Sequence, residues 1–183
     1  MAAYQALSIT VAEDNVNMRN LLCKLLRVLG VDDIHQACDG AQAMSHLQQH
    51  STDLLITDCN MAPTDGIELA RWVRLSSESP DSYLPILMVS SLSEPHQLKR
   101  AIDAGVNHFL PKPIQPRGLL LALSQVVHDP RPFIRTEDYF GPDRRQLGSQ
   151  GCPPSLERRR RDLVPSFPSH DHLDELSHHS QLS

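Results

Sequence analysis

Five short apolar segments alternate with five segments in which apolar residues recur every three or four positions, and this alternation limits the possible folds most. We predict that each apolar segment is a strand and each periodic segment a helix. The predicted strands are Leu7–Ala12, Ile34–Ala37, Leu54–Asp58, Pro85–Ser90 and His108–Leu110. The predicted helices cover residues 16–29, 41–49, 67–75, the stretch between 93 and 105, and 117–128. This order predicts a five-stranded parallel sheet with helices on both faces. Because a barrel needs about eight such units, we expect a doubly wound open sheet.

Apolar residues are concentrated in residues 1–129, which contain nine basic and fourteen acidic side chains and can bury a core. Residues 130–183 contain eight arginines, no lysine and eight acidic residues, so few apolar groups remain to offset the entropy of ordering. We therefore predict one domain over residues 5–128 and a low-complexity, largely disordered tail over 129–183. Charge is segregated in this tail, since 131–161 is basic and 162–183 is acidic and contains histidines.

No apolar run reaches the roughly 18–20 residues that span a bilayer, and the N-terminus lacks the pattern of a signal peptide. We expect a cytoplasmic protein without membrane insertion. A reducing cytosol would keep its cysteines as thiols. We expect Cys23 and Cys38 in the core, because free cysteine is usually buried. Cys59 would be sensitive to oxidation only if it were exposed and its pKa were lowered.

Ionisable and hydroxyl side chains follow or end four of the predicted strands, namely Glu13 and Asp14, Asp58, Ser90, and Lys112. The carboxyl ends of parallel strands meet at one edge of a sheet, so we expect these residues to lie together. Taken singly, each has an ordinary explanation as a loop cap or a solvent-exposed charge. Their joint placement favours a functional site. Carboxylates held close together repel one another unless a cation neutralises them, and hard oxygen ligands suit Mg²⁺.

Four sequence motifs carry a resemblance to a known family. They are Val11-Ala12-Glu13-Asp14-Asn15, the segment from Asp58 to Gly66, Pro85-Ile86-Leu87-Met88-Val89-Ser90-Ser91, and Phe109-Leu110-Pro111-Lys112-Pro113. In this order and spacing, residues 5–128 resemble the response-regulator receiver domain of two-component signalling, in the stand-alone form of the chemotaxis regulator. The resemblance implies a flavodoxin-like receiver fold and a switch that is controlled by phosphorylation.

The resemblance also implies a role for each acidic residue. Asp58 would accept the phosphoryl group and would bind Mg²⁺ together with Asp14. Glu13 would contribute to the metal site through water, and the backbone carbonyl of Asn60 would be a further ligand. A carboxylate nucleophile, Mg²⁺ and a lysine are a sufficient set for phosphoryl transfer, which depends on positioning and charge stabilisation.

Further roles follow from the same resemblance. Ser90 and Lys112 would contact phosphoryl oxygens, and Phe109 would change rotamer when Ser90 moves, although an aromatic residue on a strand is as often a plain core residue. Pro113 would follow a cis peptide bond. Asn60 and Leu92 occupy the two positions that tune dephosphorylation in the family.

Two residues depart from the usual pattern of the family. Ala62 stands where proline is common, so the loop after Asp58 could have a different shape. Ser90 stands where threonine is more common, which keeps the hydroxyl group and loses a methyl contact. We still expect a working switch.

The expected partners are a sensor histidine kinase or phosphotransfer protein and a downstream protein target. Beyond its own phosphorylation and dephosphorylation, we expect no enzyme activity. The alternative is a scaffold or nucleic-acid-associated protein that acts through its Arg-rich tail while the receiver is vestigial. In that case the arginines would grip phosphates and Tyr139 and Phe140 would stack on bases. The absence of a recognisable nucleic-acid-binding motif and the acidic domain argue against it.

Overall fold

The computed structural model describes residues 4–91, 95–128 and 131–143. Within them the five strands and five helices expected from the sequence are present, each with bounds within about two residues of the prediction. In chain order the elements are β1 (Ser8–Ala12), α1 (Val16–Val28), β2 (Asp33–Ala37), α2 (Gly40–Gln49), β3 (Leu54–Asp58), α3 (Gly66–Leu75), β4 (Ile86–Ser90), α4 (Pro95–Asp103), β5 (His108–Pro111), α5 (Pro116–Val127), β6 (Phe133–Arg135) and β7 (Phe140–Pro142).

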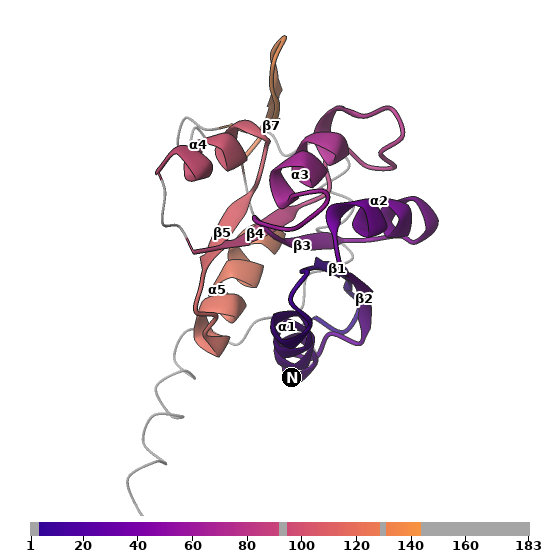
Figure 1. The fold of residues 1–183 in the computed structure, drawn as a ribbon, viewed down its shortest axis with the longest axis vertical. Helices are drawn as coiled ribbons and strands as arrows, with labels where there is room; N and C mark the ends of the chain where they lie inside the picture. Colours follow the sequence, from indigo (N-terminus) through magenta and orange to yellow (C-terminus); the bar gives the residue numbers. More distant parts are fainter. Residues whose placement is uncertain (1–3, 92–94, 129–130, 144–183) are drawn as a thin grey trace, which may run out of the picture.

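The main sheet is parallel, with the strand order β2-β1-β3-β4-β5. Helices α1 and α5 cover one face, and α2, α3 and α4 cover the other (Figure 1). Every residue of β1, β3 and β4 is buried, as expected for strands that are covered on both sides. Two apolar clusters result, one on each face. The prediction of a doubly wound, flavodoxin-like sheet is confirmed.

Local hydrogen bonds explain why three helices begin directly after the strand-end loops. The side chain of Asn15 accepts hydrogen bonds from the backbone of Asn17 and Met18 at the start of α1. Asp39 caps α2 by accepting from the backbone of Gln42. Before α3, Asp65 and Glu68 form a reciprocal capping box. These caps fix where the chain leaves each strand, and they thereby position the loops at the carboxyl edge of the sheet.

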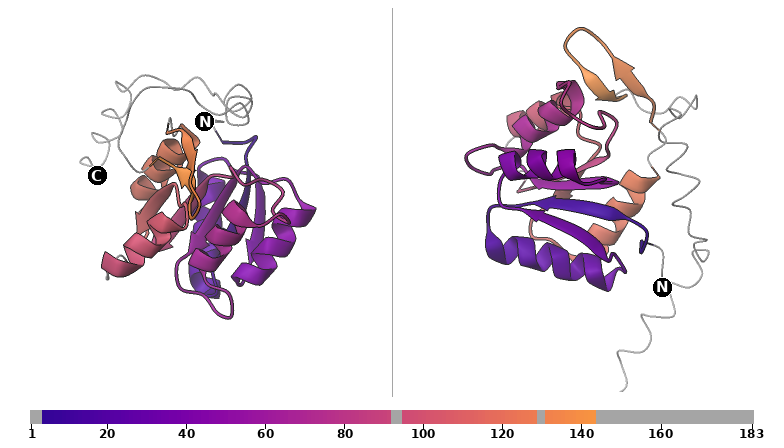
Figure 2. Two further views of the ribbon diagram at one scale, coloured as in Figure 1. Left: turned by 90° about the horizontal axis from the view of Figure 1, so that it is seen from above. Right: turned by 90° about the vertical axis from the view of Figure 1, so that its right-hand side faces the viewer.

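A β-hairpin follows α5, where the sequence analysis expected the tail to begin. Strands β6 and β7 pair antiparallel and project beyond α3 and α4 (Figure 2). Tyr139 and Phe140 are 8% and 4% exposed. The rings of Phe133 and Phe140 each lie 5.0 Å from the ring of Tyr83, in the loop before β4. The prediction of a disordered tail is therefore wrong for residues 131–143, because two aromatic rings of the hairpin pack on Tyr83 of the domain.

Arg74, near the end of α3, anchors the surroundings of this hairpin. Its side chain is 2% exposed and donates hydrogen bonds to the carbonyl oxygens of Gly105, Ser82 and Leu84 at 2.7–3.0 Å. It also donates to Oδ1 of Asn107 at 2.9 Å. The guanidinium carbon lies 5.1 Å from the centre of the Phe133 ring. Burial lowers the pKa of Arg74 to about 9, which leaves the side chain charged at neutral pH.

Gly105 sits where α4 ends and the hairpin touches the domain. Its φ angle is +84°, and a Cβ atom there would lie 2.7 Å from the carbonyl oxygen of Phe140. A glycine is therefore needed for both the left-handed turn and the close approach of β7.

Two further expectations are corrected by the structure. Cys23 is buried as predicted, but Cys38 is exposed, since it follows the last residue of the edge strand β2. Tyr139 and Phe140 are buried in the hairpin and are not available to stack on bases. Leu92 and residues 144–183, including most of the Arg-rich segment and the acidic, histidine-containing end, lie outside the described residues. Among the described helices, none has the length and apolar character needed to cross a bilayer.

We predict that Arg74→Ala lowers the free energy of unfolding by about 3 kcal/mol, because it leaves buried carbonyl groups without a donor and opens a cavity. The matched control is Arg71→Ala on the exposed side of the same helix, which should change stability by no more than about 0.5 kcal/mol. Urea unfolding of both variants measures the difference. Equal stability of the two variants would show that Arg74 does not anchor this end of the domain.

Candidate functional site

The register of the sheet brings the polar residues that follow or end the strands to one edge. Ala12 lies opposite Thr57, so Glu13 follows on beside Asp58. Asp58 lies opposite Val89, and Ser90 is opposite Pro111. The carboxyl ends of strands β1, β3, β4 and β5 thus each place a polar side chain at the same end of the sheet, as expected for this type of fold.

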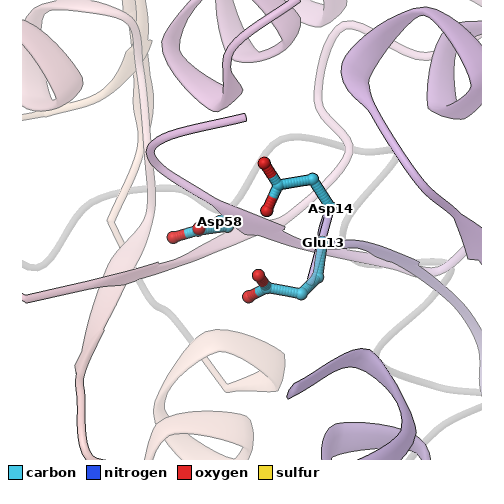
Figure 3. Close-up of side chains that lie close together, drawn as sticks. All are labelled: Glu13, Asp14 and Asp58. Carbon is cyan, nitrogen blue, oxygen red and sulfur yellow. The ribbon is translucent and has the colours of Figure 1, made fainter. Parts of the chain in front are cut away.

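Glu13, Asp14 and Asp58 form a carboxylate cluster in which one oxygen of each lies within 4.8 Å of the others (Figure 3). Glu13 and Asp58 are buried, with 1% and 6% of their surfaces exposed, whereas Asp14 is exposed. Burial and the neighbouring Asp58 raise the pKa of Glu13, although Lys112 acts in the opposite direction. Three clustered hard oxygen donors, one of them open to solvent, fit a magnesium ion that keeps several of its waters.

Lys112 lies between the two buried carboxylates. Its Nζ is 3.1 Å from Oε2 of Glu13 and 3.0 Å from Oδ2 of Asp58. Burial by itself would lower the pKa of Lys112, but the hydrogen bonds and charges of Asp58 and Glu13 outweigh this effect and raise it. The side chain is therefore a fixed ammonium ion that neutralises part of the negative charge of the cluster.

Backbone contacts hold Asp58 in place at the end of β3. Its Oδ1 accepts a hydrogen bond of 2.8 Å from the backbone N–H of Cys59, which leaves Oδ2 facing Lys112. The loop that follows folds back, so that Gly66 donates from its N–H to the carbonyl oxygen of Cys59 at 3.1 Å. A Cβ atom on Gly66 would lie 1.9 Å from the carbonyl oxygen of Asp58. Only glycine allows α3 to start this close to the acidic residue.

Ser90 and Phe109 lie on β4 and β5, next to the carboxylate cluster. Ser90 is buried, and its carbonyl oxygen accepts a hydrogen bond of 2.9 Å from the backbone N–H of Lys112. Its side chain hydrogen-bonds the thiol of Cys59. Phe109 is half-buried and packs against the apolar cluster on the face of α2, α3 and α4. The contact between Ser90 and Cys59 was not predicted, because it joins two strands that are separated by a helix in the sequence.

Cys59 does not have the properties of a redox-sensitive thiol. It is 2% exposed, and burial, followed by the charges of Asp58 and Asp65, raises its pKa. The hydrogen bond with Ser90 lowers the pKa but does not reverse the shift. A buried thiol with a raised pKa is a poor nucleophile, so the structure gives no support to oxidation at this position.

The remaining predicted site residues lie in the loops around the cluster. The Lys112–Pro113 peptide bond is cis, as the resemblance implies, and the Ala62–Pro63 bond in the loop after Asp58 is also cis, which was not predicted. Asn60 is exposed in that loop, two residues beyond Asp58. Leu92 is outside the part of the chain that the structure describes.

Comparison with known proteins gives a consistent family match. The model of the response regulator receiver domain family matches residues 9–124. Chemotaxis protein CheY-3 of Vibrio cholerae serotype O1 is 32% identical over 120 residues, which cover 66% of this chain and 91% of that protein. The match to the family ends at residue 124, so the hairpin formed by β6 and β7 lies beyond it.

Two solved structures show the same fold. The chemotaxis response regulator CheY4 of Vibrio cholerae is 28% identical, with a TM-score of 0.60, and the similarity covers 66% of this chain and 98% of that one. The receiver domain of sensor histidine kinase PA1611 from Pseudomonas aeruginosa, which has a magnesium ion coordinated in its active site cleft, is 24% identical, with a TM-score of 0.59. That similarity covers 66% of this chain and 96% of the PA1611 domain, and at this identity it shows the fold alone.

We predict that Glu13→Gln stabilises the metal-free protein at neutral pH. The folded-state pKa of Glu13 lies above the ordinary value of about 4.3, so wild-type stability falls as the pH rises from about 4 through the raised pKa. The variant has no proton to lose, and Lys112 keeps Asp58 as a partner. Its midpoint of urea unfolding in EDTA should exceed that of wild type at pH 7 and match it at pH 4. The matched control is Glu78→Gln at an exposed site. A less stable Glu13→Gln protein at pH 7 would contradict the assigned cost of burying this carboxylate.

Proposed function

Because the chain belongs to the response regulator receiver domain family, we propose that it is a phosphorylation-dependent switch in two-component signalling with Asp58 as its phosphoacceptor. The observation that carries this proposal is the placement of Lys112, whose ammonium group bridges Asp58 and Glu13 at 3.0 and 3.1 Å. An ordinary ion pair needs one carboxylate. Here two carboxylates share one ammonium group, and a third carboxylate, that of Asp14, lies within 4.8 Å of both, which suits a site that binds a metal ion and then a phosphoryl group.

In the proposed reaction, one carboxylate oxygen of Asp58 attacks the phosphorus atom of a phosphohistidine donor. A P–O bond to Asp58 forms, the P–N bond breaks, and its electron pair leaves with the imidazole nitrogen. The backbone N–H of Cys59 orients the carboxylate through Oδ1. The residues that would hold Mg²⁺ are Asp14 and Asp58 directly, Glu13 through water, and the backbone carbonyl of Asn60. When bound, this ion supplies positive charge between the carboxylates and the phosphoryl oxygens.

Lys112 and Ser90 are the groups that would respond to the new charge. A phosphoryl group adds roughly −1.5 to −2 charge near neutral pH. Lys112 would exchange its contact with Asp58 for a phosphoryl oxygen, and the Ser90 hydroxyl would leave the thiol of Cys59 to donate to another oxygen. Phe109 lies on the neighbouring strand and is only half-buried, so it has room to change rotamer when Ser90 moves. Phosphorylation would then shift the population between two conformations.

The proposed output is a change in affinity for a downstream protein at the surface of α4, β5 and α5. The donor would be a sensor histidine kinase or a phosphotransfer protein, and a cytoplasmic location remains a prediction. We propose no enzyme activity beyond phosphorylation and dephosphorylation of Asp58 itself. Two residues would act in opposite directions on the rate of dephosphorylation. Asn60 would orient the water that hydrolyses the phosphoryl group, and Leu92 would keep water away from it.

The nucleic-acid alternative loses part of its basis in the described residues. Phe140 is buried, and the guanidinium carbon of Arg135 lies 4.3 Å from the centre of its ring. Arg131 donates a hydrogen bond to the carbonyl oxygen of Asn107. These groups are used to build the hairpin, so a nucleic-acid interface would have to rely on arginines beyond residue 143.

Intact-mass spectrometry under conditions that preserve acyl phosphates tests the phosphoacceptor. We predict that the full chain, incubated with Mg²⁺ and a small acyl phosphate, gains one phosphoryl group, and that Asp58→Asn gains none. The matched control is Asp32→Asn, which changes an exposed aspartate and should be modified like wild type. Modification of Asp58→Asn to the same extent as wild type would exclude Asp58. If wild type stays unmodified with acyl phosphates and also with a histidine kinase that phosphorylates other receivers, the proposed function is wrong.

A further inference from the structure

Three histidines gather on the domain away from the carboxylate cluster. His35 is on β2, His46 is in the last turn of α2, and His50 is the residue that ends this helix. The rings of His35 and His50 are stacked, with centroids 4.5 Å apart and an interplanar angle of 16°. The ring of His46 lies 6.3 Å from that of His35 and 6.1 Å from that of His50, nearly perpendicular to both.

The fold explains why these three residues meet. Alternate residues of a strand share a face, so His35 lies on the same side of β2 as Ala37, which packs with Ala43 and Leu47 of α2. On α2, positions 43, 46, 47 and 50 form one stripe toward the sheet. The apolar part of this contact ends at Leu47, and the histidines continue it at the edge of the sheet.

Two observations support ligand binding by this cluster. Nδ1 of His46 is buried and has no hydrogen-bond partner among the described residues, although an imidazole nitrogen in such a position normally has one. Nε2 of His35 lies 3.4 Å from Oδ1 of Asp33, two residues earlier on the same strand face. A carboxylate on one ring nitrogen is the usual arrangement for a histidine that binds a metal through the other.

We propose that His35, His46 and His50 bind a divalent transition-metal ion of the zinc type, with Asp33 orienting His35. The backbone N–H of His50 donates to the carbonyl oxygen of His46 at 2.8 Å, which keeps the two residues one turn apart, the spacing of paired histidine ligands on a helix. As the rings lie, their nitrogens are not all within 4.8 Å of one another. The site therefore requires the exposed ring of His50 to rotate from the stacked position and to bring a nitrogen toward the other two.

The two sites would select different ions. Imidazole ligands suit Zn²⁺, Ni²⁺ and Cu²⁺, whereas carboxylate and carbonyl oxygens suit Mg²⁺. A metal at the histidine cluster would join the end of α2 to the edge strand β2. This proposal does not depend on phosphorylation of Asp58, and either one can fail without the other.

Zinc binding to the full chain, free of any affinity tag, tests the proposal. Cys38, Cys152, His170, His172, His178 and His179 could also bind zinc, so all proteins compared carry serine in place of both cysteines and glutamine in place of these four histidines. Excess Mg²⁺ occupies the carboxylate cluster. Isothermal titration with Zn²⁺ then compares this parent with the same protein carrying His46→Gln and His50→Gln, with His35→Gln, with Asp33→Asn, and with the control His128→Gln.

We expect the parent to bind one Zn²⁺ ion with micromolar or tighter affinity. The double variant and His35→Gln should each lose about tenfold or more, and Asp33→Asn about tenfold, while His128→Gln should bind like the parent. Zn²⁺ should also raise the unfolding temperature of the parent by more than that of the double variant at the same zinc concentration. Far-UV circular dichroism checks that each variant is folded. Equal zinc binding by the parent and the double variant would overturn the proposal, as would a parent that binds Zn²⁺ only in the millimolar range.

Discussion

The contact of Lys112 with two buried carboxylates is the constraint on which the rest of the site depends. Asp58 and Glu13 come from neighbouring strands of an apolar sheet, and both are almost inaccessible to water. Charges in such a place are costly unless they are paired. One ammonium group cannot neutralise the charge of three carboxylates, so the cluster still favours binding of a cation. A bound cation would in turn favour binding of a negatively charged phosphoryl group. The apolar strands, the helix caps and the close approach of Gly66 to Asp58 hold the three carboxylates close together, although like charges at this distance repel one another.

Two cations in this domain, the buried Arg74 and the partly buried Lys112, illustrate the difference between a structural and a functional charge. Arg74 donates to backbone carbonyls of three residues and to Asn107, all of them fixed by strands, turns or the hairpin. None of these acceptors changes its charge when the protein is phosphorylated. Among the described residues, the ammonium group of Lys112 is paired with the side chains of two acidic residues, one of which is the proposed phosphoacceptor. When the charge on Asp58 changes, the partners of Lys112 must change with it. A buried cation with alternative partners can transmit a signal, and one whose donors all meet backbone or amide oxygens stabilises the fold.

Sequence patterns were sufficient to predict the main sheet and to bring Glu13, Asp14, Asp58, Ser90 and Lys112 to one edge, because strand alternation and helix periodicity are local properties and parallel pairing follows from them. The hairpin was missed for a physical reason. Its stretch of chain is poor in apolar residues, and the aromatic rings that order it find their partners, Tyr83 and Arg74, in a distant loop and helix. The exposure of Cys38, the contact of Cys59 with Ser90 and the meeting of His35 with His46 and His50 likewise depend on which strands and helices become neighbours. Composition alone does not carry that information.

The most direct test of the central claim is whether a phosphoryl group on Asp58 changes the environment of the residues that face it. Two-dimensional ¹H–¹⁵N NMR spectra of the full chain with Mg²⁺, recorded before and after addition of a small acyl phosphate, measure this for each backbone amide. The account predicts that the amide signals of Ser90, Phe109 and Lys112 shift in wild type and stay in place in Asp58→Asn. Unchanged signals at these residues in a protein that carries the phosphoryl group, or the same shifts in Asp58→Asn, would contradict it.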